Sequence, residues 1–302
     1  MGDIIHALPA VASLKESFPQ SHITWIVSAR WAGLLEGNPS IDRVISLEGV
    51  APRALLRAAR ELQREKFDFA IDFQGLIKSA LIASAAKPGR IYGFDRSQTR
   101  EKAAALFYSH CTVSESRHVV DRNLDLARAA GAERRVIAFP LPQGEPEQRL
   151  PEGEFVLACP LAGWGSKQWP LESYGELAKR LGAPLVVNGP PSGAEALARI
   201  EGAIRHITGL PGLIYATRRA AAVVGVDSGP MQLAAALGKP GVAIFGPTDP
   251  ERNGPYGRSL HVLRSPRAAT SYKRRAEIDA SMRDITPDDV LAALGAASVH
   301  SV

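Results

Sequence analysis

The segment VVGVDSGPMQLAAALGKPGVAIFGP, residues 223 to 247, places polar residues where a buried strand must end. A parallel strand that is buried on both faces needs no charge at its end, so Asp227 indicates a polar ligand beyond the sheet edge. Ser228 can cap the following helix, Gly229 allows a ligand to approach the backbone, and Pro230 suits the first helical position. A helix that begins here would direct its free amides and positive dipole end at an anion such as a diphosphate.

Asp227 itself would repel a phosphate, so its natural partner is a sugar hydroxyl. The combination of this carboxylate with an anion-binding helix end favours a nucleotide sugar over a bare nucleotide. The alternative interpretation of the same spacing is that Asp227 and Ser228 only cap a helix.

A second cluster of polar residues follows an earlier strand, in CPLAGWGSKQWPLESYGELAKRL, residues 159 to 181. Gly163, Gly165 and Ser166 form a flexible loop with amide donors, and Lys167 adds a point charge just before a helix. That charge could neutralise a diphosphate leaving group, although a solvated surface lysine is the alternative. Neither a Walker nor a GxGxxG pattern occurs in this region, which disfavours kinases and dinucleotide-dependent enzymes.

A third set of residues in the first half of the chain has acid–base and anion-binding chemistry. Asp3 precedes a helical pattern, where it could act as an exposed general base or merely cap the helix. Lys78 lies one turn into a helix in DFQGLIKSA, and GFDRSQTREK contains Arg96, Arg100 and Lys102. Such cations are usually solvated, but they are also what recognition of a phosphorylated or carboxylated acceptor requires.

Short β-rich runs alternate with amphipathic segments along the chain, which predicts an α/β fold with parallel sheets covered on both faces. The predicted strands are 22–28, 43–47, 67–73, 90–94, 154–160, 183–189, 221–227 and 241–247. The predicted helices are 51–65, 76–86, 115–130, 171–181 and 229–238. Ser116 is expected to start the helix that ends before Gly131, and Thr286 is expected to cap a final helix with Pro287 in its first turn.

Residues 139–153, FPLPQGEPEQRLPEG, follow neither the helical nor the strand period and are rich in proline, which indicates an interdomain linker. The predicted domains are therefore residues 1–146 and 147–302, two doubly wound units that would face a cleft. The first residues form a helical apolar stripe. We therefore expect that the strand which usually opens such a domain is missing from this sequence.

The composition limits the class of protein and of partner. The chain has 302 residues, is 45% hydrophobic and carries a net charge of +5, which favours an anionic partner. The aromatic content of 6% and the absence of any nucleic-acid-binding motif argue against nucleic acid. No apolar run approaches the roughly 20 residues of a membrane helix, and no secretory signal opens the chain. Cys111 and Cys159 are far apart, which fits two small core residues in a reducing cytoplasm and argues against a zinc site.

Taken together, five ordered motifs resemble glycosyltransferase family 9, and most closely its lipopolysaccharide heptosyltransferase I branch. They are MGDIIHALPAVASLK, DFQGLIKSALIA, GFDRSQTREKAAALFY, SKQWPLESY and GVDSGPMQLAAALGKPGVAIFGPTDP. The resemblance implies a GT-B fold, with an N-terminal acceptor-binding domain and a C-terminal donor-binding domain. It further implies an inverting, metal-independent transfer of L-glycero-D-manno-heptose from ADP-heptose to Kdo of the lipid A inner core, without a cofactor, by a cytoplasmic protein peripheral to the inner membrane.

The resemblance also implies roles for individual residues. Asp3 would be the general base, Lys167 would stabilise charge on the departing ADP, and Asp227 would hold heptose hydroxyls. The other donor-binding residues would be Gly163, Ser166, Ser228, Gly229 and Gln232, the last standing where many relatives carry a histidine. The acceptor-binding residues would be Lys78, Arg96, Arg100 and His118, and no residue is assigned to a metal.

Two other functions fit parts of the sequence. A catalytically silent nucleotide-sugar binding protein would bind ADP without turnover. An NAD-dependent oxidoreductase would share the α/β architecture, but the chain lacks the glycine fingerprint and a suitably spaced ribose-binding acid.

Overall fold

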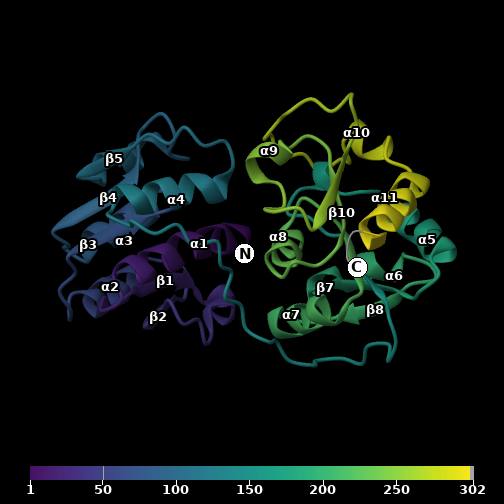
Figure 1. Cartoon of the computed structure of the whole chain (residues 1–302), viewed down its shortest axis with the longest axis horizontal. Helices are drawn as coiled ribbons and strands as arrows, with labels where there is room; N and C mark the ends of the chain where they lie inside the picture. The colour runs from purple at the N-terminus through teal and green to yellow at the C-terminus, as the bar shows by residue number, and fades with distance from the viewer. Residues whose placement is uncertain (50, 300–302) are drawn as a thin grey trace. The chain divides into compact units, whose positions relative to one another are not determined.

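The computed structural model describes residues 1–49 and 51–299, which form two compact units (Figure 1). One unit contains His6–Pro142; the other contains Gln143 onwards together with Met1–Ile5. Every strand pair in the described residues is parallel, which confirms the predicted α/β class.

The larger unit contains one continuous six-stranded sheet in the order β11-β10-β9-β6-β7-β8. Its strands are β6 (Val156–Cys159), β7 (Leu185–Gly189), β8 (Ile204–Ile207), β9 (Ala222–Val226), β10 (Gly241–Phe245) and β11 (Leu260–Arg264). This is the doubly wound order, in which the chain moves outward from β6 to one edge and then returns to build from β9 to the other edge. The point where the direction changes, between β6 and β9, is where such sheets bind ligands beyond their carboxyl ends.

Helices cover both faces of this sheet. The α-helices are α5 (Leu171–Arg180), α6 (Ala194–Ala198), α7 (Leu210–Arg219), α8 (Gly229–Ala236), α9 (Pro250–Asn253), α10 (Ala280–Arg283) and α11 (Pro287–Val299), with 3-10 turns η3 (Gly165–Lys167) and η4 (Pro191–Gly193). On one face Val224 and Ile244 pack in a core with Tyr174 of α5 and Leu294 of α11. On the other face Gly225 lies against α8, where an added Cβ would come within 2.6 Å of the Met231 sulfur.

The smaller unit contains two separate parallel sheets, β1-β2 and β3-β4-β5. The strands are β1 (Thr24–Ser28), β2 (Arg43–Leu47), β3 (Phe69–Asp72), β4 (Arg90–Phe94) and β5 (His110–Thr112). The helices are α1 (Gly2–Ser17), α2 (Pro52–Leu62), α3 (Ile77–Ala85) and α4 (Val119–Ala129), with η1 (Ala29–Leu35) and η2 (Lys102–Phe107), and the first residues of α1, up to Ile5, belong to the larger unit. The described residues open with α1, as the helical stripe predicted, and no strand precedes it among them.

The proline-rich segment contains no helix or strand, and part of it is fixed to the larger unit. The Glu145 amide donates to the Pro211 carbonyl at 3.1 Å, and Glu147 Oε2 accepts from the Gly209 amide at the start of α7. A carboxylate at this position also stabilises the positive end of the helix. The linker after residue 142 therefore has a defined course along α7.

Three strands and one long helix were not predicted from the sequence. The strands β5, β8 and β11 lie at sheet edges, where one side is exposed and the apolar signal is weak. The helix α7 begins at Leu210, and the Pro211 and Gly212 that follow resemble a turn in sequence. The expectation for Cys111 was wrong because it lies exposed on the edge strand β5, whereas Cys159 is buried in β6 as expected.

The final helix confirms the predicted cap. Thr286 Oγ1 accepts from the Asp289 amide at 3.2 Å, and Asp289 Oδ2 accepts from the Thr286 amide at 2.8 Å, so the two residues form a reciprocal capping box. Hydrogen bonds from the Thr286 hydroxyl and amide lower the pKa of Asp289 below 3.8. Ionised Asp289 therefore stabilises the fold above pH 3.8, and this contribution is lost as the pH falls through its lower folded-state pKa.

We predict that Asp289→Asn lowers the free energy of unfolding at neutral pH by about 1 kcal/mol, the usual value of a helix cap. The difference from the wild-type chain should shrink as the pH falls below 3.8, which urea unfolding across that range measures. Asp288→Asn is the matched control, because it removes a carboxylate from the same turn, with only an exposed ion pair to Arg180, and leaves the capping box intact. An equal decrease in the free energy of unfolding in the two variants would contradict a specific role for the cap.

Candidate active site

The loops that follow β6 and β9 carry the two strongest candidates from the sequence, Lys167 and Asp227. The two strands are hydrogen-bonded neighbours at the point where the sheet order reverses, so both loops leave the same sheet edge. Lys167 Nζ donates to Asp227 Oδ2 at 3.0 Å. The structure thus joins residues that are 60 positions apart in the sequence.

This ion pair is largely removed from solvent, with side-chain exposures of 14% for Lys167 and 12% for Asp227. The hydroxyl of Thr248, in the loop after β10, also donates to Asp227 Oδ2, at 2.8 Å. Charges at this depth lose hydration, so each requires partners within the protein. Asp227 Oδ2 has two donors, which fix the orientation of the carboxylate.

The loop that carries Lys167 is held by two tryptophans. Trp169 is fully buried, donates from Nε1 to the Ile285 carbonyl at 2.8 Å, and meets the Tyr174 ring edge-to-face. The ring of Trp164 lies 4.8 Å from Lys167 Nζ, a distance typical of a cation–π contact. The lysine is therefore positioned by both a carboxylate and an aromatic ring.

The start of α8 differs from the expected cap in one respect. Ser228 occupies the N-cap position with extended backbone angles, but its side chain makes no capping hydrogen bond. Its Oγ is buried with no hydrogen-bond partner in the structure. The prediction that the Ser228 hydroxyl caps the helix is therefore wrong. The backbone N–H groups in the first turn of α8 receive no hydrogen bond from that hydroxyl.

Gly229 adjoins the first residue of the chain. A Cβ at Gly229 would lie 2.8 Å from Met1 Cβ, so only glycine fits there without displacing Met1, which belongs to the same compact unit. Asp3 is exposed and lies inside the first turn of α1, which begins at Gly2 and not after Asp3 as expected. Its position as an exposed carboxylate agrees with the requirement for a general base, but its role stays a prediction.

The other donor-binding candidates differ in accessibility. Gly163 is exposed, and no atom would lie within 4 Å of an added Cβ. Ser166 is 1% exposed, and its Oγ has no hydrogen-bond partner in the structure. Gln232 is also buried, and its amide nitrogen donates to the Asn253 carbonyl at 2.8 Å, which links α8 to α9. Gly163 is thus directly available to a ligand, whereas Ser166 and Gln232 are covered.

Three of the four acceptor candidates lie on exposed positions at the carboxyl edge of the β3-β4-β5 sheet, namely Lys78, Arg96 and Arg100. The loops that carry them are connected, because the Glu101 amide donates to the Gly75 carbonyl at 3.0 Å and the Ile77 amide donates to Glu101 Oε2 at 2.7 Å. Gly75 has a φ of +67° and leaves room for the neighbouring loop. The structure therefore gathers these cations on one sheet edge.

Asp72, at the end of β3, organises this edge and was missed in the sequence. It is 4% exposed, and its carboxylate accepts from the Gln74 amide, the Gly75 amide and the Ser79 hydroxyl. The Tyr108 hydroxyl also donates to Asp72, at 2.7 Å. Burial and the neighbouring charge of Asp72 raise the pKa of Tyr108 above its usual value, which keeps the phenol as a donor.

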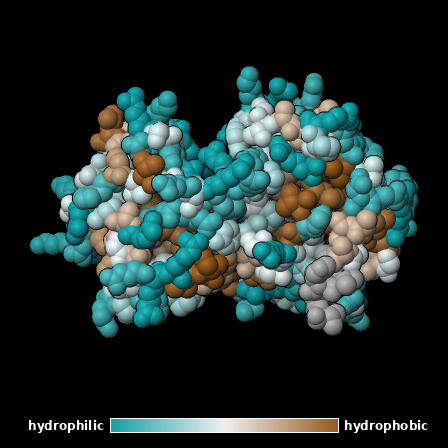
Figure 2. All heavy atoms as spheres, turned by 45° about the horizontal axis from the view of Figure 1, so that its top comes forward, coloured by the Kyte–Doolittle hydropathy of each residue, from teal (hydrophilic) through white to brown (hydrophobic). Residues whose placement is uncertain are grey.

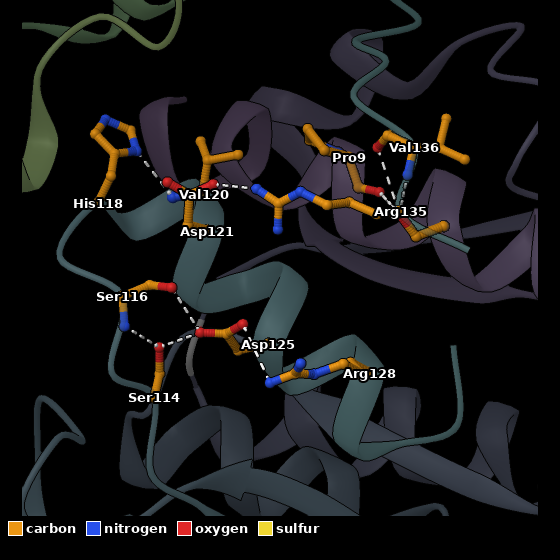
Figure 3. Close-up of polar contacts among 11 residues, drawn as sticks. Pro9, Ser114, Ser116, His118, Val120, Asp121, Asp125, Arg128, Arg135 and Val136 are labelled. Carbon is orange, nitrogen blue, oxygen red and sulfur yellow. Dashed lines mark hydrogen bonds and ion pairs between the residues drawn. The ribbon is translucent and has the colours of Figure 1, made fainter. Parts of the chain in front are cut away.

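His118, the fourth acceptor candidate, has a structural role at the start of α4 (Figure 3). Its Nδ1 accepts from the Val120 amide at 3.1 Å, so the ring caps the helix. The expected cap, Ser116, instead donates to Asp125 Oδ2 at 2.8 Å, beside a similar bond from Ser114. The prediction that Ser116 starts this helix was therefore wrong, because Asp125 competes for its hydroxyl.

Sequence signals for the missed residues were weak. Asp72 is the second-last residue of the predicted strand 67–73 and the last residue of the observed β3, so the argument used for Asp227, a charge at a strand end, also applies to it. Thr248 follows the strand β10 in GPTDP, but a threonine in a turn is ordinary, and only the fold brings it to Asp227.

Comparison with known proteins identifies the family. The family model for glycosyltransferase family 9, the heptosyltransferases, matches residues 55–281. The chain is 30% identical to lipopolysaccharide heptosyltransferase 1 of Escherichia coli K12, over 88% of this chain and 91% of that protein. It is also 30% identical to the protein of the same name from Pseudomonas aeruginosa, over 86% and 79% of the two chains.

Solved structures agree with this result. The E. coli heptosyltransferase WaaC with ADP superimposes with a TM-score of 0.77 at 25% identity, over 98% of this chain and 97% of that chain. The family 9 glycosyltransferase from Veillonella parvula has a TM-score of 0.82 at 22% identity, over 99% and 94% of the two chains, which supports the GT-B fold. The chain belongs to glycosyltransferase family 9, the heptosyltransferases, and is a glycosyltransferase with the GT-B fold.

Proposed function

We propose that this chain transfers L-glycero-D-manno-heptose from ADP-heptose to Kdo of the lipid A inner core, with inversion and without a metal. The relatives named lipopolysaccharide heptosyltransferase 1 support the reaction, and the solved E. coli enzyme with ADP supports the nucleotide. The observation that carries the proposal is the Lys167–Asp227 pair at the strand-order reversal, beside the start of α8. It combines a cation for phosphate with a carboxylate for sugar hydroxyls.

The donor would bind across this pair. Both protein donors to Asp227 use Oδ2, so Oδ1 can accept a heptose hydroxyl without breaking either bond. The amides at Ser228 and Gly229 face the diphosphate in this proposal, since a helix start favours anions. Residues 147–302 would thus form the donor-binding domain, and the cations Lys78, Arg96 and Arg100 would assign acceptor binding to residues 1–146.

The transfer step follows from these roles. The acceptor hydroxyl oxygen forms a bond to the anomeric carbon on one face of the sugar. The bond from that carbon to the diphosphate oxygen breaks on the other face, and its electron pair leaves with ADP. Asp3 takes the hydroxyl proton, while Lys167 and the amides of α8 compensate the charge on the leaving group.

The proposed acceptor is a lipid, so we expect the protein to act peripherally at the cytoplasmic face of the inner membrane. In support, Leu81 of α3 and Leu106 of η2 are exposed, the latter by 80%, and the cations Lys78 and Lys102 lie on the same two elements. The face drawn in Figure 2 is mostly hydrophilic, with apolar atoms in separate clusters. None of the helices within the described residues has the length and apolar character needed to span a bilayer.

The direct test is calorimetric titration with ADP-heptose, followed by an assay of the same sample for transfer to Kdo-lipid A, with ADP release as the readout. We expect binding and transfer. Binding without transfer at any acceptor concentration would instead support a silent nucleotide-sugar binding protein. Absence of binding would contradict the donor assignment.

We predict that Asp3→Ala lowers the transfer rate at least about a hundredfold, because it removes the proposed general base. The dissociation constant for ADP should be unchanged, since the proposal gives Asp3 no contact with the nucleotide. Glu16→Ala in the same helix is the control for the loss of a surface carboxylate. A variant at Asp3 that retains the wild-type rate would exclude this residue as the base.

We predict that Thr248→Val lowers the transfer rate about tenfold, because it removes one of the two donors that orient Asp227. Thr248→Ser should restore the rate, because it retains the hydroxyl. Steady-state kinetics with ADP-heptose distinguishes this positioning role from a loss of folded protein, which would scale the rate with the folded fraction and leave KM unchanged. If the valine and serine variants had equal transfer rates, the Thr248 hydroxyl would have no role in orienting Asp227.

A further inference from the structure

Residues 271–279, SYKRRAEID, form a basic segment without helix or strand between β11 and α10, here termed the basic strap. Its cations are Lys273, Arg274 and Arg275, all exposed. A short run of cations is usually a solvated loop. In the structure the strap is attached to the loop that carries Lys167.

The attachment uses the backbone of Ser166. The Ser166 amide donates to the Arg275 carbonyl at 3.1 Å, and the Asp279 amide donates to the Ser166 carbonyl at 3.4 Å. Gly165 permits this approach, since a Cβ there would lie 1.7 Å from the Ala276 carbonyl oxygen. Both hydrogen bonds join backbone groups to backbone groups. They therefore fix the backbone of the strap against the backbone of the Lys167 loop.

The side chain of Arg274 extends the contact to Trp164. Its Cζ lies 5.6 Å from the centre of the Trp164 ring, the same ring that lies 4.8 Å from Lys167 Nζ. Two cations from different segments therefore share one aromatic ring. Arg274 is thus placed in the neighbourhood of Lys167 by a specific contact, and it remains exposed.

The charge at the candidate site shows why a further cation matters. Lys167 and Asp227 form an ion pair, so together they carry no net charge. The start of α8 contributes roughly half a positive charge. A nucleoside diphosphate sugar carries two ionised phosphates, and released ADP gains up to about one more negative charge because the second pKa of a terminal phosphate is about 6.

The strap contains cations that the structure links to this loop, through the Arg275 carbonyl and the Arg274 side chain. Of its two carboxylates, Asp279 is engaged as the cap of α10, where it accepts from the Ser281 amide and hydroxyl. Glu277 is exposed, so the strap carries two negative charges against three positive ones. The strap therefore remains net positive beside a pair that is neutral.

We propose that the basic strap is a diphosphate-binding element of this glycosyltransferase, with Arg274 as its principal contact to the nucleotide. The proposal rests on the nucleotide-linked donor of the proposed function. A guanidinium suits this role, because it can donate two parallel hydrogen bonds to phosphate oxygens while it stacks on an aromatic ring. The strap supplies positive charge that the Lys167–Asp227 pair cannot supply.

The test is calorimetric titration of the full chain with ADP. Arg274→Gln should raise the dissociation constant for ADP about tenfold and weaken its dependence on salt concentration. Arg274→Lys should recover part of the affinity, because it keeps the charge. The matched control is Arg283→Gln, an exposed arginine in α10 with no role in the site, which should bind ADP as the wild-type chain does.

A second variant changes the strap without changing any charge. Gly165→Ala should displace the strap through the clash with the Ala276 carbonyl, and it should also weaken ADP binding. Wild-type affinity in Arg274→Gln, or equal affinity of the glutamine and lysine variants, would overturn the strap proposal while the proposed function stands. If the wild-type chain itself fails to bind ADP, the donor assignment and the strap proposal both fail.

Discussion

The ion pair between Lys167 and Asp227 is the interaction on which the candidate site of the larger unit depends. Its two charges are mostly withdrawn from water, and each would be costly to bury alone. The loops after β6 and β9 must therefore be held close enough for contact at 3.0 Å. Trp169 anchors one loop to the segment before α11, and Thr248 orients the carboxylate on the other.

The neutrality of this pair has consequences for ligand binding. A donor that places a phosphate near Lys167 and a hydroxyl near Asp227 satisfies both charges at once, whereas a bare anion satisfies only one and meets the repulsion of the other. The pair is therefore better suited to a nucleotide sugar than to inorganic phosphate. An additional source of positive charge, outside the pair, is what favours the diphosphate specifically.

The smaller unit also has a carboxylate at the end of a parallel strand, but this one is bound by protein groups. Asp72 also lies at the carboxyl end of a parallel strand, but its oxygens accept from two amides and two hydroxyls of the protein. Asp72 therefore fixes the loops around Gly75, and we assign it no contact with a ligand. Gly93 makes this possible, because a Cβ there would overlap the Tyr108 ring that reaches Asp72. The sheet edge that these hydrogen bonds hold in place thus carries the exposed cations Lys78, Arg96 and Arg100.

Much of the architecture was predictable from local sequence. The central strands are continuous apolar runs, and Thr286 with Pro287 has the local chemistry of a helix start, so these elements were predicted correctly. Edge strands such as β8 were missed because half-exposed residues lose the apolar signal. Ser116 was misassigned because its hydroxyl donates to Asp125, an acceptor that lies nine residues beyond the expected cap.

The sequence by itself determined the α/β class, the family and the identity of the two charged residues at the strand ends, because these depend on residue type and on short spacings. Only the tertiary structure decided that Lys167 pairs with Asp227, that Thr248 completes the pair and that the basic strap lies against Gly165. These contacts join segments separated by 20 to more than 100 residues. Their geometry follows from strand order and packing, which no local pattern of residues encodes.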